Sequence, residues 1–326
     1  MSRSWSMVML ALSVFIRAGA QDRPVHTYSI VARDSVTGEL GVAVQSHWFS
    51  VGPLVPWAEA GVGAVATQSF VDPSYGPLGI ELMRSGKTAR QALEGLVASD
   101  PGREVRQVAM VDARGSVAAH TGTRCIPAAG HIEGEQFTVE ANLMLNDGVW
   151  PAMAKAYRDS KGDLAERMLS ALEAAQSAGG DIRGSQSAAI LIVSGTPTGK
   201  PWQDRLMDLR VEDHPEPLAE LRRLVTLHRA YQRMNAGDVA TEHNDIALAL
   251  KEYGAAMEMA PQNLEMKYWT AVALVNAGRI DESLPLFRAV FTSDPQWAEL
   301  TPRLPGVGLL KAGNDVLERI LKTSER

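Results

Sequence analysis

The chain has 326 residues, of which 45% are hydrophobic and 21% charged, and its net charge is −6. This length favours two domains, and the apolar share excludes a wholly disordered chain. Acidic residues outnumber basic ones by 38 to 32, which disfavours nucleic-acid binding through a broad cationic surface.

The first twenty residues, MSRSWSMVMLALSVFIRAGA, have the pattern of a secretory signal peptide. Arg3 supplies the positive charge, Met7–Ile16 the apolar stretch, and Ala18-Gly19-Ala20 a small-x-small cleavage site. The apolar stretch is shorter than the roughly 20 residues that span a bilayer. We therefore expect residues 1–20 to be a signal peptide, the protein to be periplasmic or secreted, and no stable membrane insertion. The alternatives are an N-terminal membrane anchor or a mis-set start codon.

Strand formers and turn residues alternate in the next part of the chain. Tyr28–Arg33 and Leu40–Val44 flank the turn sequence Asp34–Gly38 and predict a β-hairpin. Gly61–Thr67 predicts a third strand, whose small residues suit close packing.

Helices are expected to follow. Tyr75–Ser85 is one, and Thr88 with Gln91 has the spacing of a capping box that begins a second. The further expected elements are a hairpin of Gln107–Val111 and Ser116–His120, a strand at Phe137–Met144, a helix from Asp163 to Gly179, and a strand at Ser187–Val193.

Strands and helices thus come in blocks, which indicates an α+β fold and not the regular alternation of a doubly wound sheet. Two sheets packed face to face with helices outside would bury both faces of each sheet. We predict a four-layer αββα domain over residues 21–215, with no strand after about residue 203.

Residues 216–326 are predicted to form an all-α domain. Leu221, Leu224 and Tyr231 have helical spacing, and Pro261 and Pro295 lie 34 residues apart in similar surroundings. A helical period of this length with a proline after the second helix resembles tetratricopeptide repeats. The alternative is an unrelated helical bundle.

Motifs for cofactors and metals are absent from the sequence. It contains no P-loop, dinucleotide fingerprint, zinc-ligand spacing or nucleophile elbow, so we expect no cofactor and no metal. Asp72 and Asp147 are interpreted as turn or cap residues. Cys125 is the single cysteine, which excludes an internal disulfide and favours a buried thiol.

Several motifs carry a family resemblance. They are Thr27–Asp34, Gly38–Ser46, Gly61–Gln68, Asp72–Gly76, Asp100–Gly102, His120–Gly122, Gly184–Ala188 and Asp208–Pro215. Together they resemble a bacterial domain-of-unknown-function family that is classed with the Ntn (N-terminal nucleophile) hydrolases. The resemblance covers about residues 26 to 223 and implies the four-layer αββα fold.

In Ntn hydrolases the first residue of the first strand is Thr, Ser or Cys. Its side chain attacks an amide carbonyl and its own α-amine takes the proton.

The resemblance places candidate site residues at strand ends. Thr27 matches the nucleophile, and Ser29 lies on the same side of that strand because side chains alternate. Ser46 ends the second strand and could orient the amine. Gln68 ends the third strand and could bind substrate or an oxyanion, and Asn142 could supply an amide donor. The simpler interpretation is that these residues cap strand ends and turns.

The chemistry demands that the α-amine of Thr27 be free. A free α-amine has a pKa of about 7.7–8.0 and is a competent base near neutrality. Signal cleavage after Ala20 would leave Gln21–His26 ahead of Thr27, up to about 20 Å of extended chain. Either a second cut, for example a self-catalysed one at the His26–Thr27 bond, exposes Thr27, or the site is silent. His26 is a poor substitute base because adjacent strand residues point to opposite faces.

Two functions therefore remain open. The first is an exported Ntn-type hydrolase that uses Thr27 and Ser46 on a small amide or peptide-like substrate. The second is a catalytically silent scaffold that binds a ligand or a protein, with the C-terminal helices as the docking surface. The sequence leaves oligomerisation undecided.

Overall fold

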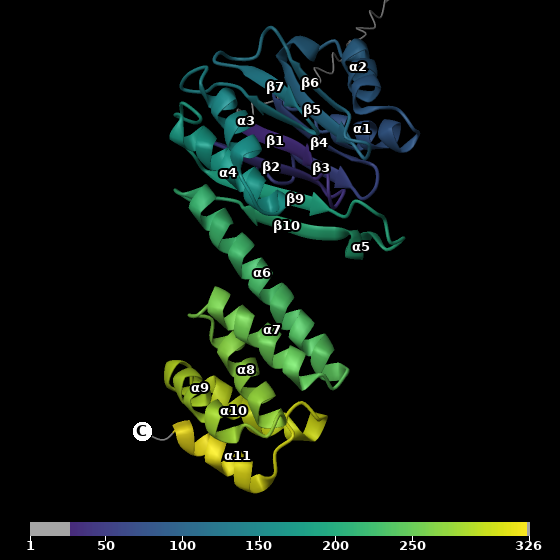
Figure 1. Cartoon of the computed structure of the whole chain (residues 1–326). Helices are drawn as coiled ribbons and strands as arrows, with labels where there is room; N and C mark the ends of the chain where they lie inside the picture. The colour runs from purple at the N-terminus through teal and green to yellow at the C-terminus, as the bar shows by residue number, and fades with distance from the viewer. Residues whose placement is uncertain (1–26, 325–326) are drawn as a thin grey trace, which may run out of the picture.

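The chain forms two lobes joined by one long helix (Figure 1), seen in a computed structural model that describes residues 27–324. The proposed signal peptide, residues 1–20, lies outside the described residues. The strands are β1 Thr27–Arg33, β2 Leu40–Ser46, β3 Pro56–Glu59, β4 Gly63–Ser69, β5 Arg106–Asp112, β6 Val117–Thr121, β7 Gly130–Gly134, β8 Phe137–Ala141, β9 Ser187–Val193 and β10 Arg205–Val211. The α-helices are α1 Tyr75–Arg84, α2 Ala89–Ser99, α3 Val149–Asp159, α4 Leu164–Ser177, α5 Pro201–Asp204, α6 Pro217–Glu242, α7 Ile246–Met259, α8 Leu264–Asn276, α9 Ile280–Ser293, α10 Gln296–Leu300 and α11 Asn314–Leu321.

The first lobe contains two antiparallel sheets. The larger sheet has the strand order β10-β9-β2-β1-β8-β7, and the smaller has the order β3-β4-β5-β6. The hairpins that the turn residues predict are present, since β1 pairs with β2 and β5 pairs with β6. An α+β domain followed by an all-helical region is therefore confirmed.

Side-chain alternation assigns each strand two different environments. On β1, Ile30 and Ala32 pack with the helix side of the larger sheet, whereas Val31 packs with residues of the smaller sheet. The space between the sheets is filled by small and β-branched side chains such as Val42, Ala64 and Ala109. Such alternation fixes the register, because a slip of one residue would exchange the two faces.

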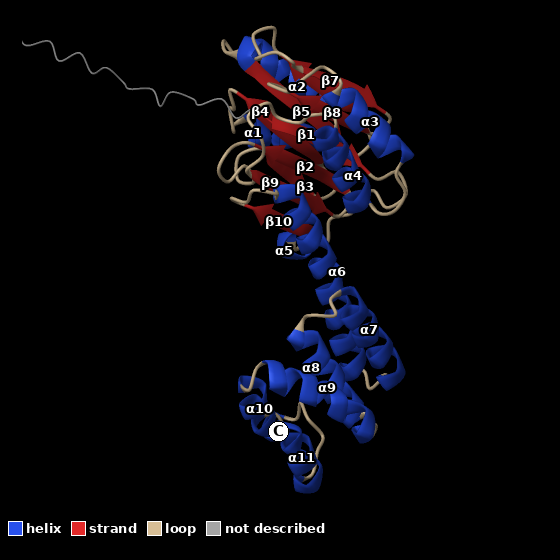
Figure 2. Ribbon diagram, turned by 90° about the vertical axis from the view of Figure 1, so that its left-hand side faces the viewer, coloured by secondary structure: helices blue, strands red, loops and turns tan. Residues whose placement is uncertain are grey.

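Helices cover the outer faces of both sheets (Figure 2). Helices α1 and α2 pack on the smaller sheet, where Ile80 and Leu93 meet Met110. Helices α3 and α4 pack on the larger sheet, where Met153 and Leu172 share a core with Tyr28 and its neighbours.

The predicted helix starts have the expected caps. The Thr88 side chain accepts from the backbone of Gln91, and the Gln91 side chain accepts from the backbone of Thr88, which confirms the capping box. Asp163 caps α4 by accepting from the backbone of Glu166 at 2.9 Å. Cys125 is buried without a disulfide, as predicted, and burial raises the pKa of its thiol.

The prediction that strands end after about residue 203 is wrong. Strand β10 follows that position and pairs with β9 at the edge of the larger sheet. Its charged residues Asp208 and Arg210 obscured it, because an edge strand lacks a neighbour on one side and often carries charged side chains. The short strands β3 and β7 were also not anticipated.

Helix α6 connects the lobes (Figure 1). It begins with Pro217, a residue well suited to the first helical position because its missing N–H would have no partner there. Leu218, Leu221 and Val225 complete the core under the larger sheet. Further along, Met234 and Ala240 belong to a separate core with α7 and α8. One helix is thus part of both cores.

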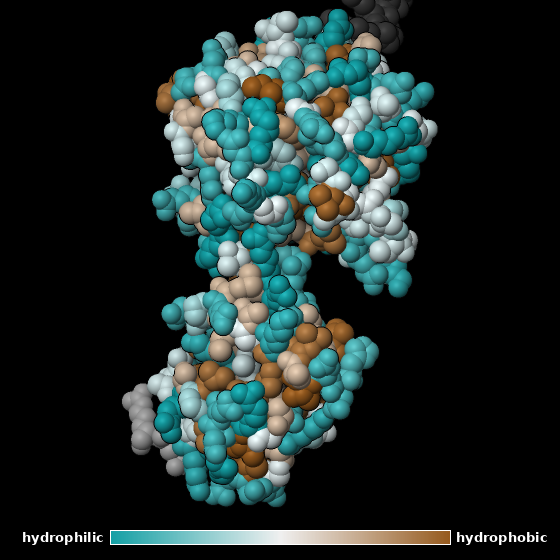
Figure 3. All heavy atoms as spheres, in the orientation of Figure 1, coloured by the Kyte–Doolittle hydropathy of each residue, from teal (hydrophilic) through white to brown (hydrophobic). Residues whose placement is uncertain are grey.

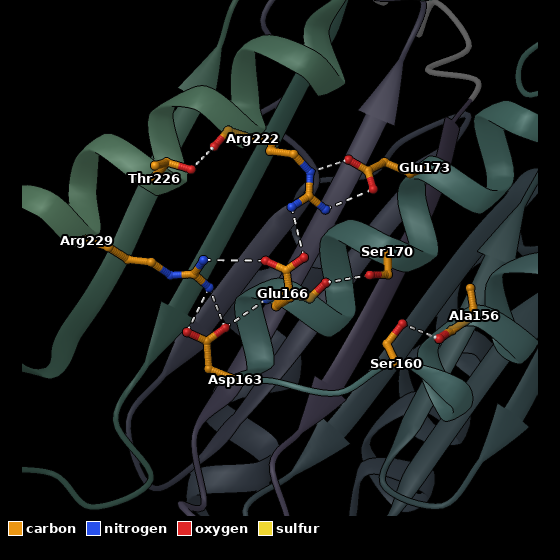
Figure 4. A network of polar contacts seen from close by, with 9 residues as sticks. All are labelled: Ala156, Ser160, Asp163, Glu166, Ser170, Glu173, Arg222, Thr226 and Arg229. Carbon is orange, nitrogen blue, oxygen red and sulfur yellow. Dashed lines mark hydrogen bonds and ion pairs between the residues drawn. The ribbon is translucent and has the colours of Figure 1, made fainter. Parts of the chain in front are cut away.

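Ion pairs attach α6 to α4 (Figure 4). The Arg222 guanidinium reaches Glu166 at 2.9 Å and Glu173 at 2.5 Å. Two turns further along, Arg229 pairs with Asp163 at 2.6 Å. These side chains are partly shielded, so the network stabilises the joint more than isolated surface pairs would.

The helical lobe has a core of its own. Tyr268, Phe287 and Phe291 are almost completely buried and pack in tilted and edge-to-face arrangements. The space-filling view shows hydrophobic groups gathered on this lobe below a narrow waist (Figure 3). None of the helices in the described part of the chain combines the length and apolar character needed to cross a bilayer.

Candidate functional site

One end of the space between the sheets is polar. Thr27 and Ser29 point into it from β1, because they lie on the same face as Val31. Other strands that border the space contribute polar side chains at the same end. We call this set the inter-sheet cluster; its members are Thr27, Ser29, Ser46, Gln68, Gln107, Glu140 and Asn142, each 0% exposed.

Strand pairing brings the members together. Thr27 is opposite Ser46 in the β1–β2 register, and Gln68 is opposite Gln107 in the β4–β5 register. Asn142 follows β8 directly, and its backbone N–H donates to the Thr27 carbonyl at 3.1 Å. All five residues predicted from the sequence therefore lie in one cluster.

Thr27 is held at both its hydroxyl and its carbonyl. Its Oγ1 donates to Ser46 Oγ at 3.1 Å. Its carbonyl also lies within reach of Gln68 Nε2 at 3.3 Å and Asn142 Nδ2 at 3.4 Å. The predicted partners thus fix the first strand at the residue proposed as the nucleophile.

Three side-chain amides form the centre of the cluster. Gln107 Oε1 accepts from Gln68 Nε2 at 2.7 Å and from Asn142 Nδ2 at 2.8 Å. Gln107 Nε2 in turn donates to the Ala141 carbonyl at 2.9 Å. Because each amide is oriented by its partners, the donors of Gln68 and Asn142 both face Thr27 and Gln107.

Glu140 is the one carboxyl group of the cluster. Ser29 Oγ lies 2.5 Å from Glu140 Oε1 and 2.7 Å from Gln68 Oε1. A serine hydroxyl has one hydrogen, and the Gln68 oxygen can only accept. Ser29 therefore donates to Gln68, and Glu140 carries a proton that it donates to Ser29. Burial raises the pKa of Glu140 well above its usual range, in agreement with this assignment.

The polar contacts continue to the edge of the sheets. Gln107 Nε2 donates to Thr121 Oγ1 at 2.9 Å, and Thr121 Oγ1 lies 2.8 Å from His131 Nδ1. Burial lowers the pKa of His131, so its ring is neutral near pH 7. His131 reaches Thr27 only through these intermediates and is therefore poorly placed as its general base.

Backbone strain is concentrated beside the cluster. Ser69 has φ of 69° and Leu143 has φ of 59°, and they directly follow Gln68 and Asn142. Non-glycine residues rarely adopt this left-handed conformation, and a bulky leucine does so at a cost. The backbone therefore changes direction at Ser69 and at Leu143, each just after a residue that contacts Thr27.

The sequence analysis missed two members, Glu140 and Gln107. A signal for Glu140 was present, since Thr138, Glu140 and Asn142 alternate along one strand and share a face. Gln107 had no comparable signal, because its importance comes from its pairing with Gln68 across two separate strands.

The cluster offers three hydroxyls, three side-chain amides and a neutral carboxyl. It contains no lysine, arginine or ionised carboxylate, so its side chains supply no strong base for Thr27. Among residues 27–324, no group of three His, Cys, Asp or Glu side chains is placed to hold a metal ion. The arrangement suits nucleophilic chemistry at Thr27 only if a base comes from the backbone of Thr27 itself.

A family model described as "Family of unknown function (DUF1028)" matches residues 27–221. The chain belongs to this family. The matched region begins with Thr27, contains every strand of the two sheets, and ends inside α6.

The chain is also similar to a solved structure, that of protein SPO2555 from Silicibacter pomeroyi, itself described as DUF1028. The two share 29% sequence identity with a TM-score of 0.55, over 61% of this chain and 84% of the other. No curated protein matches the chain.

Proposed function

We propose that this DUF1028 protein is an exported amide hydrolase of the N-terminal-nucleophile type, with Thr27 as nucleophile and Ser46 as its orienting partner. The observation that carries the proposal is the position of Thr27. It is the first residue of β1, and its hydroxyl points between two antiparallel sheets toward Ser46 at 3.1 Å. Helices on both outer faces agree with a four-layer αββα arrangement of that type.

The proposed reaction forms and breaks one ester. Thr27 Oγ1 attacks the carbonyl of a small amide or peptide-like substrate, and the α-amine of Thr27 takes the hydroxyl proton. That proton then passes to the leaving amine as the C–N bond breaks. Water attacks the resulting threonine ester, releases the acid and restores the hydroxyl. Ser29 would contribute as a substrate-side polar contact.

Amide donors would stabilise the developing oxyanion. Gln68 Nε2 and Asn142 Nδ2 already face the first residue of β1. Each amide now donates to Gln107 Oε1 and to the Thr27 carbonyl. In this role each would exchange its bond to the Thr27 carbonyl for one to the substrate oxyanion.

The proposal requires that Thr27 become the mature N-terminus. The chemistry lacks a base while the nitrogen of Thr27 is part of a peptide bond. Thr27 is also 0% exposed, so substrate entry requires the chain around it to move or be removed. Removal of the residues that precede Thr27 would supply the free amine.

The test combines mass and activity. Intact-mass analysis of the exported protein should show a chain that begins with Thr27. On a panel of chromogenic amides, Thr27→Ala should lower kcat/KM at least about 10³-fold, because it removes the attacking atom. Thr27→Ser should retain measurable turnover, since it keeps a hydroxyl. A chain that begins only with Gln21, together with turnover that survives Thr27→Ala, would contradict the proposal.

The alternative is a silent scaffold that binds a ligand or a protein. The complete burial and dense hydrogen bonding of the inter-sheet cluster favour it. It predicts that the Thr27-start form binds amides without turnover in calorimetry. The helical lobe, which resembles tetratricopeptide repeats in its sequence period, would then be the docking surface.

A further inference from the structure

The helical lobe contains a cavity of about 570 Å³ that the proposed hydrolase chemistry does not use. Helices α6, α7 and α8 line it, and Leu309 closes one side. Three aromatic side chains form much of the wall, namely Tyr231, Tyr253 and Trp269. A space of this size accepts an organic group and not only a single ion.

Three carboxylates border the same cavity: Asp238, Glu242 and Glu265. The Tyr253 hydroxyl donates to Asp238 at 2.7 Å, and the Tyr231 hydroxyl donates to Glu265 at 2.6 Å. Each carboxylate accepts one hydrogen bond in this way and keeps further lone pairs for other donors. Among the described residues, none of the three forms an ion pair, and the lining contains no lysine, arginine or histidine.

The carboxylates do not converge on one point. No three of the acidic, histidine or cysteine side chains in the described ranges are close enough to share a metal ion. Their spacing suits a group larger than a metal ion. Aromatic faces attract organic cations, and a carboxylate within reach adds direct charge pairing. The wall chemistry thus favours a guanidinium or ammonium group over a neutral or anionic one.

A backbone segment of the chain itself is held at the rim. The Asn276 side chain donates to the Leu309 carbonyl at 2.9 Å and accepts from the Lys311 N–H at 2.7 Å. One amide therefore holds both polar groups of an irregular segment of the chain itself. This segment of the chain's own backbone thus forms one edge of the cavity.

We propose that this cavity docks an extended peptide segment of a partner protein that presents an arginine or lysine side chain to Tyr231, Tyr253 and Trp269. The charged head contacts Asp238, Glu242 and Glu265, and the peptide backbone runs beside the segment that Asn276 holds. The site lies in the helical lobe and is independent of any reaction at Thr27.

The test is calorimetric titration of the full exported protein with two heptapeptides of glycine and alanine. One has a central arginine, and the other has citrulline, a neutral group of the same shape. The arginine peptide should bind at least tenfold more tightly at low salt, and rising salt should reduce the difference. Equal binding of the two peptides, or no binding of either, would overturn the proposal.

Variants identify the cavity as the site. The triple change Asp238→Asn, Glu242→Gln and Glu265→Gln should abolish the preference for arginine. Glu242 is exposed, so Glu242→Gln alone keeps the fold and should weaken arginine binding about threefold. Glu258→Gln, an exposed carboxylate of α7 outside the cavity, should leave binding unchanged. An arginine preference that persists in the triple variant would place the binding elsewhere and refute the assignment.

Discussion

The two ends of the space between the sheets differ in polarity although the same strands line both. On β1 the inward face changes from Thr27 and Ser29 to Val31, and on β4 it changes from Gln68 to Ala66 and Ala64. The apolar end has an obvious stabilising role, since burial contributes about 25 cal/mol for each Å².

The polar end stabilises the fold much less. Each buried amide or hydroxyl costs about 1–3 kcal/mol unless a partner satisfies it, and a satisfied one contributes only about 1 kcal/mol net. A seven-residue buried cluster with strained backbone at Ser69 and Leu143 is therefore an expensive way to fill a core. Buried polar groups and strained backbone, where apolar packing would be more stable, are typical of functional sites.

The largest expected effect is at the apolar end. Leu40 is completely buried between the sheets, so Leu40→Ala should lower the free energy of unfolding by about 2–5 kcal/mol through the cavity it leaves. Urea unfolding followed by circular dichroism measures this loss. Val36 lies in the turn that precedes β2 and is 92% exposed, so Val36→Ala should change the free energy of unfolding by no more than about 0.5 kcal/mol. Similar losses for both variants would remove the energetic contrast between core and surface in this lobe.

A stabilising change is expected at the polar end. Burial raises the pKa of Glu140, so the folded state binds a proton that the unfolded state releases above its pKa of about 4.3. Stability must therefore fall as pH rises from that value toward the raised pKa of the folded state. Glu140→Gln keeps a donor to Ser29 without this penalty and should stabilise the protein by about 1–3 kcal/mol at pH 8.

The pH dependence is the decisive readout for Glu140. The advantage of Glu140→Gln should shrink as pH falls toward 4. There Glu140 of the unsubstituted protein becomes protonated in the unfolded state as well as in the folded state. Thermal unfolding at a series of pH values measures it. Glu135→Gln, an exposed residue of the β7–β8 turn, is the matched control and should show no such trend. A Glu140→Gln advantage that is constant with pH would mean that Glu140 is not the buried proton-binding group.

The smallest effect on stability is expected at Ser46. Ser46→Ala removes the acceptor of the Thr27 hydroxyl and should cost about 1 kcal/mol. Its effect on amide turnover should be larger, because the nucleophile loses its orienting contact. Unfolding and activity are measured on the same preparation.

Ser187 is the natural control for Ser46. It lies opposite Ser46 in the β2–β9 register. Its hydroxyl, however, donates to the Trp48 carbonyl at 2.5 Å and accepts from the Val51 N–H at 3.2 Å. Ser187→Ala should lower stability at least as much as Ser46→Ala while turnover is retained. Loss of turnover in Ser187→Ala and retained turnover in Ser46→Ala would contradict the roles assigned to the two serines.

The sequence indicated much of the first lobe because its main elements are strongly patterned. The turn of Asp34–Gly38 and the capping box of Thr88 are local signals, and the structure contains both. Strand β10 was missed because its exposed face carries Asp208 and Arg210, so its apolar pattern is weak.

The site was indicated in part for a similar reason. Strand ends are where polar residues interrupt an apolar face, and Thr27, Ser46 and Gln68 all occupy such ends. Gln107 depends on which strands become neighbours, and no local pattern contains that information. The protonation of Glu140 depends on the position of one hydrogen between Ser29 and Gln68, which only the distances reveal.

Helix α6 makes the two lobes interdependent. A chain truncated before Pro217 would leave the surface under Leu218, Leu221 and Val225 open to water on the larger sheet. A helical fragment that begins after Glu242 would in turn lose Ala230, Met234 and Ala240 from its own core. We therefore expect heating to melt both lobes in a single cooperative transition, because neither can lose this helix and keep an intact interior.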